Sequence, residues 1–282
     1  MAEVFPMENK DQLREELQTI EKWEKDQKGL FFWEKLGRIP FMMLDKVTPK
    51  FLHNKINDLL DEIAKYIDTG GQYLVNNDAT LDKASKLLSL DGKLTLEDVQ
   101  TFPLENMDKV ANAFIVTRAK NAQIQGATTG IGGIFTLAID IPLILGLTLK
   151  TIQEVAVAYG YDPTDKEERI FMVKCMQFTS SDVVGKKAIL EELTAPKRGQ
   201  GFSQLQGWRE VFMTYRDNFG WKKLFQMIPI AGMIFGAYMN KTAIQDVGEA
   251  ANMLYKKRRV LERLERLDNL DLLITDKKEP TT

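Results

Sequence analysis

The sequence predicts an all-α protein, a multi-helix globular bundle of about ten helices with a central pair of Gly-rich apolar helices. Apolar side chains recur every three or four positions in nearly every segment, which is the spacing of one helix face. There is no convincing run of alternating apolar and polar residues, so strands are not expected. The third observation is residues 131–149, IGGIFTLAIDIPLILGLTL, an almost wholly apolar run with Asp140 and Pro142 at its centre.

The N-terminal part predicts a charged amphipathic helix over residues 7–26. Its apolar face consists of Leu13, Leu17, Ile20 and Trp23. An aromatic-rich segment follows over residues 29–49, and a long helix is expected from Lys50 towards Asp68. We divide the chain into an N-terminal segment of residues 1–50, a helical domain of residues 51–266 and a C-terminal tail of residues 267–282.

Shorter helices are expected before the apolar run. One covers residues 81–88, Thr95 opens a brief helix, and Pro103 begins a longer one. The apolar face of that longer helix is Met107, Val110, Ala111, Phe114 and Ile115.

The run itself is expected to belong to two helices rather than one. Asp140 as N-cap and Pro142 in the first turn are typical of a helix start, so the second helix is predicted from Ile141 to Tyr159. Gly160 would end it, because glycine tolerates the left-handed conformation of a C-cap.

Helices are next expected over residues 169–178 and 183–193, followed by a loop at residues 195–203. Two short helices then precede Pro229, which begins a long helix that continues through Arg266.

A membrane-spanning helix at 131–149 is disfavoured by its insertion energy. Its eleven Leu, Ile and Phe residues contribute about −5 kcal/mol together, whereas a central Asp costs about 3 kcal/mol. The Pro, Thr and Gly residues bring the sum near zero. The sequence leaves open whether the run is buried in protein or contacts lipid.

Glycine pairs four residues apart occur in two apolar helices, at Gly126 and Gly130 and at Gly232 and Gly236. Such pairs lie on one helix face and let another backbone come close. They fit a membrane-type or re-entrant helix pair, or close packing in a soluble core, and the two segments are candidates for packing on one another.

Composition points to a globular protein rather than a disordered or integral membrane one. Charged residues make up 28% and hydrophobic residues 44%, with net charge −2 and mean hydropathy −0.25. A nucleic-acid binder would be more basic. Cys175 is the single cysteine and the N-terminus shows no signal-peptide pattern, so a reducing cytoplasm is expected, with a peripheral position at the inner face of the cell membrane as a further option.

No catalytic, cofactor-binding or metal-binding residues are expected. The single histidine, His53, has no sequence support for pairing with Cys175, and no nucleotide, hydrolase or metal motif is present. Asp140 and Glu154 share a helix face but lie about 20 Å apart. An acid/base couple would therefore need a partner from another helix, such as Arg118 for Glu154 or Asn240 for Asp140.

A basic cluster, Lys256, Lys257, Arg258 and Arg259, follows the second apolar helix. It is a candidate for contact with anionic lipid headgroups. It equally fits a solvated helix surface on which Glu262 and Glu265 are interleaved.

The block from Gly126 to Tyr161, followed by DPTDKEER, together with Pro229–Asn240 and Tyr255–Arg259, resembles the signatures of the EcsC protein family over about residues 51–266. The resemblance implies a bacterial protein of a group associated with an ABC transporter and secretion, with no established catalytic residue or cofactor. The matching positions are Gly126, Gly130, Gly133, Asp140, Pro142, Gly160, Tyr161, Pro229, Gly232, Gly236, Asn240 and Arg259; Glu154 lies in the same block.

We therefore expect a non-catalytic helical protein that acts by binding at or near the cytoplasmic membrane face. Its partner would be an anionic membrane surface or a membrane protein, not nucleic acid. The alternatives are a soluble scaffold or interaction protein whose core is wholly buried, and a hydrolase of unknown type with a polar pocket at Asp140, Glu154 or Asn240.

Overall fold

The computed structural model describes residues 7–27, 76–130, 137–180, 183–194 and 229–276. Within these ranges it contains eight α-helices and no strand, which confirms the predicted all-α class. The helices are α1 (Lys10–Asp26), α4 (Asn77–Leu88), α5 (Leu96–Gln100), α6 (Leu104–Gly130), α7 (Leu137–Ala158), α8 (Lys166–Ser180), α9 (Val183–Thr194) and α11 (Pro229–Asp276). The aromatic segment, the helix expected from Lys50, His53 and the segment 195–227 lie outside the described residues.

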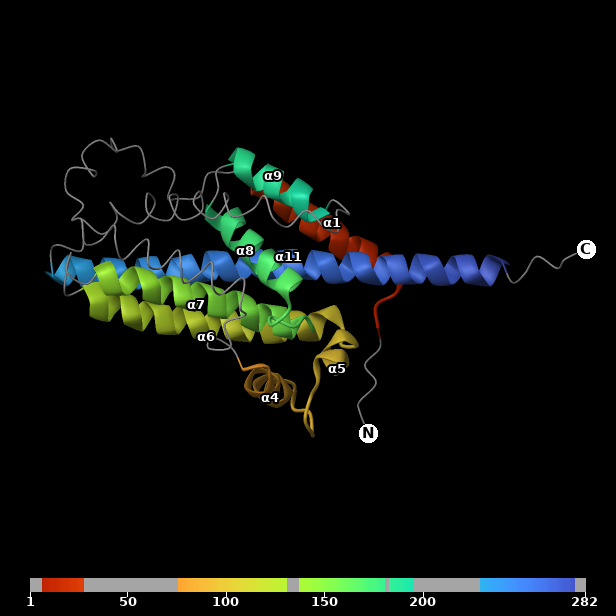
Figure 1. The fold of residues 1–282 in the computed structure, drawn as a ribbon, viewed down its shortest axis with the longest axis horizontal. Coiled ribbons are helices and arrows are strands. Elements are labelled where there is room, and N and C mark those ends of the chain that lie inside the picture. The colour runs from red at the N-terminus through yellow and green to blue at the C-terminus, as the bar shows by residue number, and fades with distance from the viewer. Residues whose placement is uncertain (1–6, 28–75, 131–136, 181–182, 195–228, 277–282) are drawn as a thin grey trace, which may run out of the picture.

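Helix α11 is the axis around which the others are arranged (Figure 1). It has 48 residues, which corresponds to a length of about 72 Å. Helices α6 and α7 run alongside its N-terminal half, and α1 and α8 pack against its middle. Helix α9 packs on α8, and α4 and α5 pack beside α6 and α7. The ends of α6, α7 and α11 therefore meet at one end of the bundle, whereas the C-terminal part of α11 projects from the other (Figure 1).

Side chains at the helix starts explain several boundaries. The carboxamide of Asn9 accepts hydrogen bonds from the backbone N–H groups of Asp11 and Gln12 and caps α1. Thr95 and Asp98 form a reciprocal capping box, which confirms the predicted start of α5. Each cap satisfies backbone donors that the first helical turn leaves unpaired.

Gly160 ends α7 as predicted. Its φ is +75°, a conformation that favours glycine. The N–H of Gly160 donates to the Val157 carbonyl, and that of Tyr161 donates to the Ala156 carbonyl, both at 3.0 Å, which is a Schellman motif. A Cβ atom at Gly160 would also lie 2.7 Å from Cγ of Gln100. Both backbone conformation and packing thus require glycine here.

The predicted start of α7 is wrong. The helix begins at Leu137, so Asp140 lies in its first turn instead of serving as its N-cap. Pro142 lies inside the helix, where it has no backbone N–H to donate to the Ala138 carbonyl. We attribute the continuity of the helix to tertiary packing on α6 and α11, because helices in proteins owe most of their stability to such packing.

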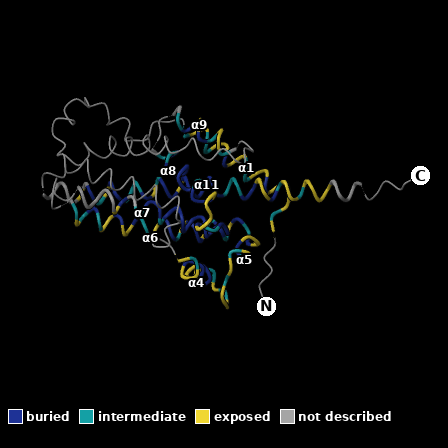
Figure 2. The backbone as a smooth tube through the Cα atoms, viewed as in Figure 1, coloured by how far each residue is buried: buried dark blue, intermediate teal, exposed yellow. Residues whose placement is uncertain are grey.

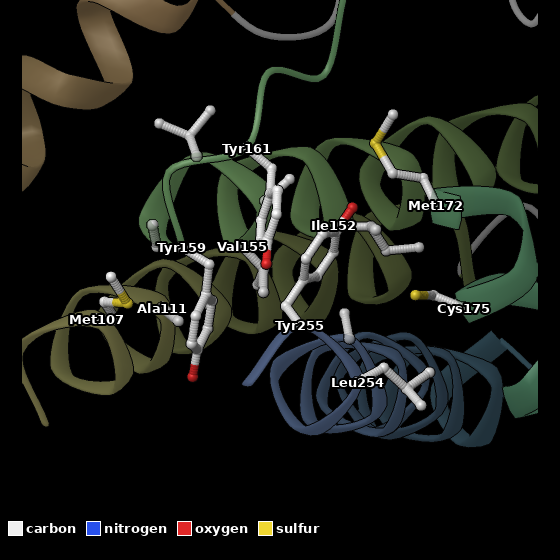
Figure 3. Close-up of a cluster of buried hydrophobic side chains, with 14 of the residues drawn as sticks. Met107, Ala111, Ile152, Val155, Tyr159, Tyr161, Met172, Cys175, Leu254 and Tyr255 are labelled. Atoms are coloured by element: carbon white, nitrogen blue, oxygen red, sulfur yellow. The ribbon is translucent and has the colours of Figure 1, made fainter. Parts of the chain in front are cut away.

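The hydrophobic core lies where α6, α7, α8 and α11 meet (Figure 2). The five residues predicted as the apolar face of α6 are all buried, and every residue from Thr151 to Tyr161 is buried. Figure 3 shows Tyr159, Tyr161 and Tyr255 together in this core, with the rings of Tyr161 and Tyr255 5.4 Å apart between centroids.

Helix α11 begins at Pro229, as predicted, but continues past Arg266 to Asp276. Part of the segment expected to be a tail is therefore helical. The Lys10 ammonium group contacts Asp268 and lies 3.0 Å from the carboxylate of Asp271. Both carboxylates are well exposed, so these pairs contribute little to stability.

Candidate functional site

Exposed apolar side chains gather at the end of the bundle where α6 ends and where α7 and α11 begin. Four large apolar side chains have relative solvent exposures between 46% and 67%: Ile124, Leu143, Ile234 and Tyr238. We call this set the apolar end. It comes from three different helices, and their arrangement in Figure 1 places these segments at the same end of the molecule. Large exposed apolar side chains grouped in this way are typical of an interaction surface.

The apolar run is thus buried in one part and exposed in another. Ile144, Thr148 and Leu149 are buried, whereas Leu143 is 46% exposed. Ile144 packs with Ala119, Ala122 and Ile244 in a small core of its own between α6, α7 and α11. Residues 131–136 lie outside the described part of the chain. For the described residues, protein covers the C-terminal part of the run and leaves Leu143 open.

A close glycine contact holds α6 to α11 at this end. A Cβ atom at Gly126 would lie 2.1 Å from the carbonyl oxygen of Gly236 and 2.9 Å from Nδ2 of Asn240. No side chain fits in that space, so the two backbones touch, as the glycine spacing suggested for these two segments. Gly130 and Gly232 lie within α6 and α11.

Charged residues are scarce in the sequence stretches that carry the apolar end. Between Lys120 and Lys150 the only charged residue is Asp140, and between Lys223 and Lys241 there is none. Gly133 also belongs to the first of these stretches and lies outside the described residues. For Asp140 and Pro142 the structure describes the backbone alone.

Four lysines flank the charge-poor stretches, and three of them lie on described helices: Lys120 on α6, Lys150 on α7 and Lys241 on α11. In the part of the chain that the structure describes, none of the three forms an ion pair. We did not single them out from the sequence. The signal that could have found them is their position as the first charges on either side of an apolar stretch.

The predicted basic cluster is in a different situation, because carboxylates inside the protein bind it. Lys256 Nζ lies 2.7 Å from Asp108 of α6 and 2.6 Å from Glu16 of α1. Lys257 Nζ lies 2.7 Å from Glu24 of α1. These two lysines therefore join α11 to α1 and α6.

Arg258 and Arg259 complete the same pattern. Arg258 Nη1 lies 2.8 Å from Glu168 of α8, whose other oxygen accepts a hydrogen bond from Tyr255 at 2.6 Å. Arg259 is buried and donates to the carbonyl oxygen of Tyr159 at 2.6 Å. Burial raises the pKa of Glu168, an effect that the Arg258 guanidinium opposes. With all four cations bound internally, lipid contact by this cluster has no support in the geometry.

Glu154 is paired with Arg118, the partner considered from the sequence. Arg118 Nε and Nη2 lie 2.6 and 2.5 Å from the two carboxylate oxygens, and the carboxylate side chain is only 2% exposed. The hydrogen bonds to Glu154 raise the pKa of Arg118. A bidentate pair of this kind fixes α7 against α6 and leaves Glu154 without a free oxygen for acid/base chemistry.

The described residues offer few other candidates for a binding or catalytic site. A partly open groove of about 230 Å³ lies between α1, α8, α9 and α11, with Phe171, Leu190 and Leu254 in its lining. Its two cationic lining residues, Lys257 and Arg258, already have carboxylate partners. Cys175 is fully buried, and burial raises the pKa of its thiol. Within the described ranges, no three His, Cys, Asp or Glu side chains are placed to hold a metal ion.

None of the described helices combines the length and the hydropathy needed to cross a membrane.

The described residues thus form an all-α helical bundle with an apolar end and an internally paired basic cluster. The chain belongs to the EcsC protein family, whose model matches residues 14–260. It is 53% identical to "Uncharacterized protein YdbA" of Bacillus subtilis over 264 residues, which cover 92% of this chain and 97% of that protein. It is 30% identical to "Protein EcsC" of the same organism over 162 residues, which cover 57% of this chain and 67% of that protein. No solved structure matches the chain.

Proposed function

We propose that this EcsC family member is a non-catalytic peripheral protein that binds the cytoplasmic face of a membrane through the apolar end of its bundle. The proposal rests on four well-exposed apolar side chains, Ile124, Leu143, Ile234 and Tyr238. They lie on three helices, at the end of the bundle where α6 ends and α7 and α11 begin. An ABC transporter as neighbour, which the family resemblance implies, is compatible with this location.

The apolar end is held together by a close contact between two helices. The contact between Gly126 and Gly236 brings α6 and α11 together without side chains between them. Amphipathic helices that lie in a membrane interface bury their apolar face about 5–10 Å into the boundary between headgroups and acyl chains. In this proposal the apolar end enters that layer while the rest of the bundle stays in water.

The energy of such a contact is modest. Each of the four side chains is about half buried already, so inserting it contributes about 1 kcal/mol, or about 4 kcal/mol for the set. That corresponds to a dissociation constant of about 1 mM. Stable peripheral binding generally needs a second attraction besides one apolar anchor.

Two alternatives fit the described geometry less well. A scaffold with a wholly buried core predicts that both apolar segments are covered, whereas Leu143 and Ile234 are exposed. A hydrolase using Glu154 would need a free carboxylate, whereas both of its oxygens accept hydrogen bonds from Arg118.

Flotation of the purified protein with liposomes tests the proposal. We expect the wild-type chain to float with vesicles and the double variant Ile124→Asp/Ile234→Asp to stay at the bottom of the gradient. Val116→Asp is the matched control, because Val116 is 51% exposed on α6 but lies about 12 Å from Ile124 along the helix, away from the apolar end. Wild-type protein that floats with no vesicle composition, or a double variant that floats as well as the control, would refute membrane binding at this end.

A further inference from the structure

We infer that Lys120, Lys150 and Lys241 form a lysine ring that binds the headgroup phosphates of anionic phospholipids when the apolar end enters the membrane. The inference rests on the proposed function and names the lipid class for the same site. We do not assign lipid binding to the basic cluster Lys256–Arg259, because its cations are bound to carboxylates of the protein itself.

The three lysines lie at similar distances from the contact between Gly126 and Gly236, measured along the helices away from the apolar end; we call this direction below the contact. Lys120 precedes Gly126 by six residues and Lys241 follows Gly236 by five, so each lies about 8–9 Å from the contact along its helix.

The third lysine is placed through the ion pair between α6 and α7. Arg118 lies about 12 Å below Gly126 along α6 and binds Glu154, and Lys150 lies about 6 Å nearer the apolar end than Glu154. Its depth is therefore about 6 Å below the glycine contact. The three ammonium-bearing positions agree to within about 3 Å although they come from three helices.

Three of the exposed apolar side chains lie beyond the lysine ring, toward the ends of the helices. Ile124 is four residues beyond Lys120, and Leu143 is seven residues beyond Lys150. Ile234 is likewise seven residues beyond Lys241. These spacings correspond to about 6–11 Å, so these three side chains lie beyond the lysine ring, nearer the ends of the helices. With these side chains at the acyl boundary, the lysine ring lies on the headgroup side of them.

The electrostatics of the lysine ring call for an anionic partner. No ion pair satisfies these lysines among the described residues, in contrast to Lys256 and Lys257. Lys150 is partly buried, and this burial together with the nearby Arg118 guanidinium lowers its pKa. A phosphate at this position would offset both effects. Since the lysines come from three helices around one apolar end, a planar layer of phosphates complements them better than a single anionic side chain would.

Binding to two vesicle types tests the inference separately from the proposed function. One type contains phosphatidylcholine alone, and in the other part of it is replaced by phosphatidylglycerol. Each lysine near an anionic surface contributes about 1 kcal/mol, a fivefold change in affinity. We therefore expect Lys120→Gln/Lys150→Gln/Lys241→Gln to bind the anionic vesicles about 100-fold more weakly than wild type and to bind phosphatidylcholine vesicles unchanged.

The control variant Lys22→Gln/Lys25→Gln/Lys109→Gln removes the same net charge from exposed lysines on α1 and on the N-terminal part of α6, outside the helix segments that carry the apolar end. It should bind anionic vesicles within about twofold of wild type, and thermal unfolding should show that both triple variants are folded. Equal weakening of both triple variants, or equal binding of wild type to both vesicle types, would overturn the lysine ring while leaving membrane binding intact. Wild-type protein that binds neither vesicle type would overturn both proposals.

Discussion

The carbonyl oxygen of Gly236 occupies the space that a side chain at Gly126 would need, at 2.1 Å from the position of its Cβ atom. Two residues far apart in the sequence thus set the closest approach of α6 and α11. That approach shapes the end of the bundle from which Ile124 and Ile234 are exposed. Its disruption should therefore affect both stability and the candidate membrane surface.

Gly126→Ala should destabilise the protein by about 2 kcal/mol. The added methyl group meets backbone rather than a flexible side chain, so α6 and α11 must separate, and overpacking of this kind costs about 3 kcal/mol before the gain of about 1 kcal/mol from the higher helix propensity of alanine. Urea denaturation would measure the free energy of unfolding.

Gly146→Ala is the matched control for that experiment. Gly146 lies within α7, and nothing lies within 4 Å of the position of its Cβ atom. Alanine should therefore stabilise the protein here by about 0.5–1 kcal/mol through helix propensity alone. If Gly126→Ala were as stable as Gly146→Ala, the tight contact between Gly126 and Gly236 would be wrong.

The pair of Arg118 and Glu154 should behave as a buried structural ion pair. Removing one partner leaves an uncompensated charge, so we expect Arg118→Met or Glu154→Leu alone to cost about 3–5 kcal/mol in unfolding free energy. The double variant should lose less than either single variant, since an apolar pair of similar size has no charge to bury. A double-mutant cycle by chemical denaturation measures this coupling, and additive losses would contradict it.

Cys175 should be unreactive in the folded protein. Burial raises the pKa of its thiol well above the usual range, so at neutral pH the reactive thiolate is suppressed and the sulfur is inaccessible. A colourimetric thiol reagent should modify less than about one tenth of the protein without denaturant and all of it in concentrated urea. Rapid stoichiometric labelling of native protein would show that the core around Cys175 opens readily.

Local sequence signals predicted those helix boundaries that depend on nearby residues. Thr95 opens α5 and Gly160 ends α7, because a capping side chain or a positive φ acts within a few residues. The start of α7 was wrong for the complementary reason: Asp140 and Pro142 resemble a helix start locally, but α7 begins at Leu137.

The sequence by itself determined the all-α class, the positions of the apolar runs and the glycines that permit close backbone contact. Only the tertiary structure decided which cations are bound internally and which remain available. Lys256 forms ion pairs with Asp108 and Glu16, which lie on helices distant in sequence. Lys120, in contrast, has no ion-pair partner in the described part of the chain. The physical reason is that the free energy of a charge depends on its neighbours within a few ångströms, and those neighbours are set by helix packing rather than by sequence distance.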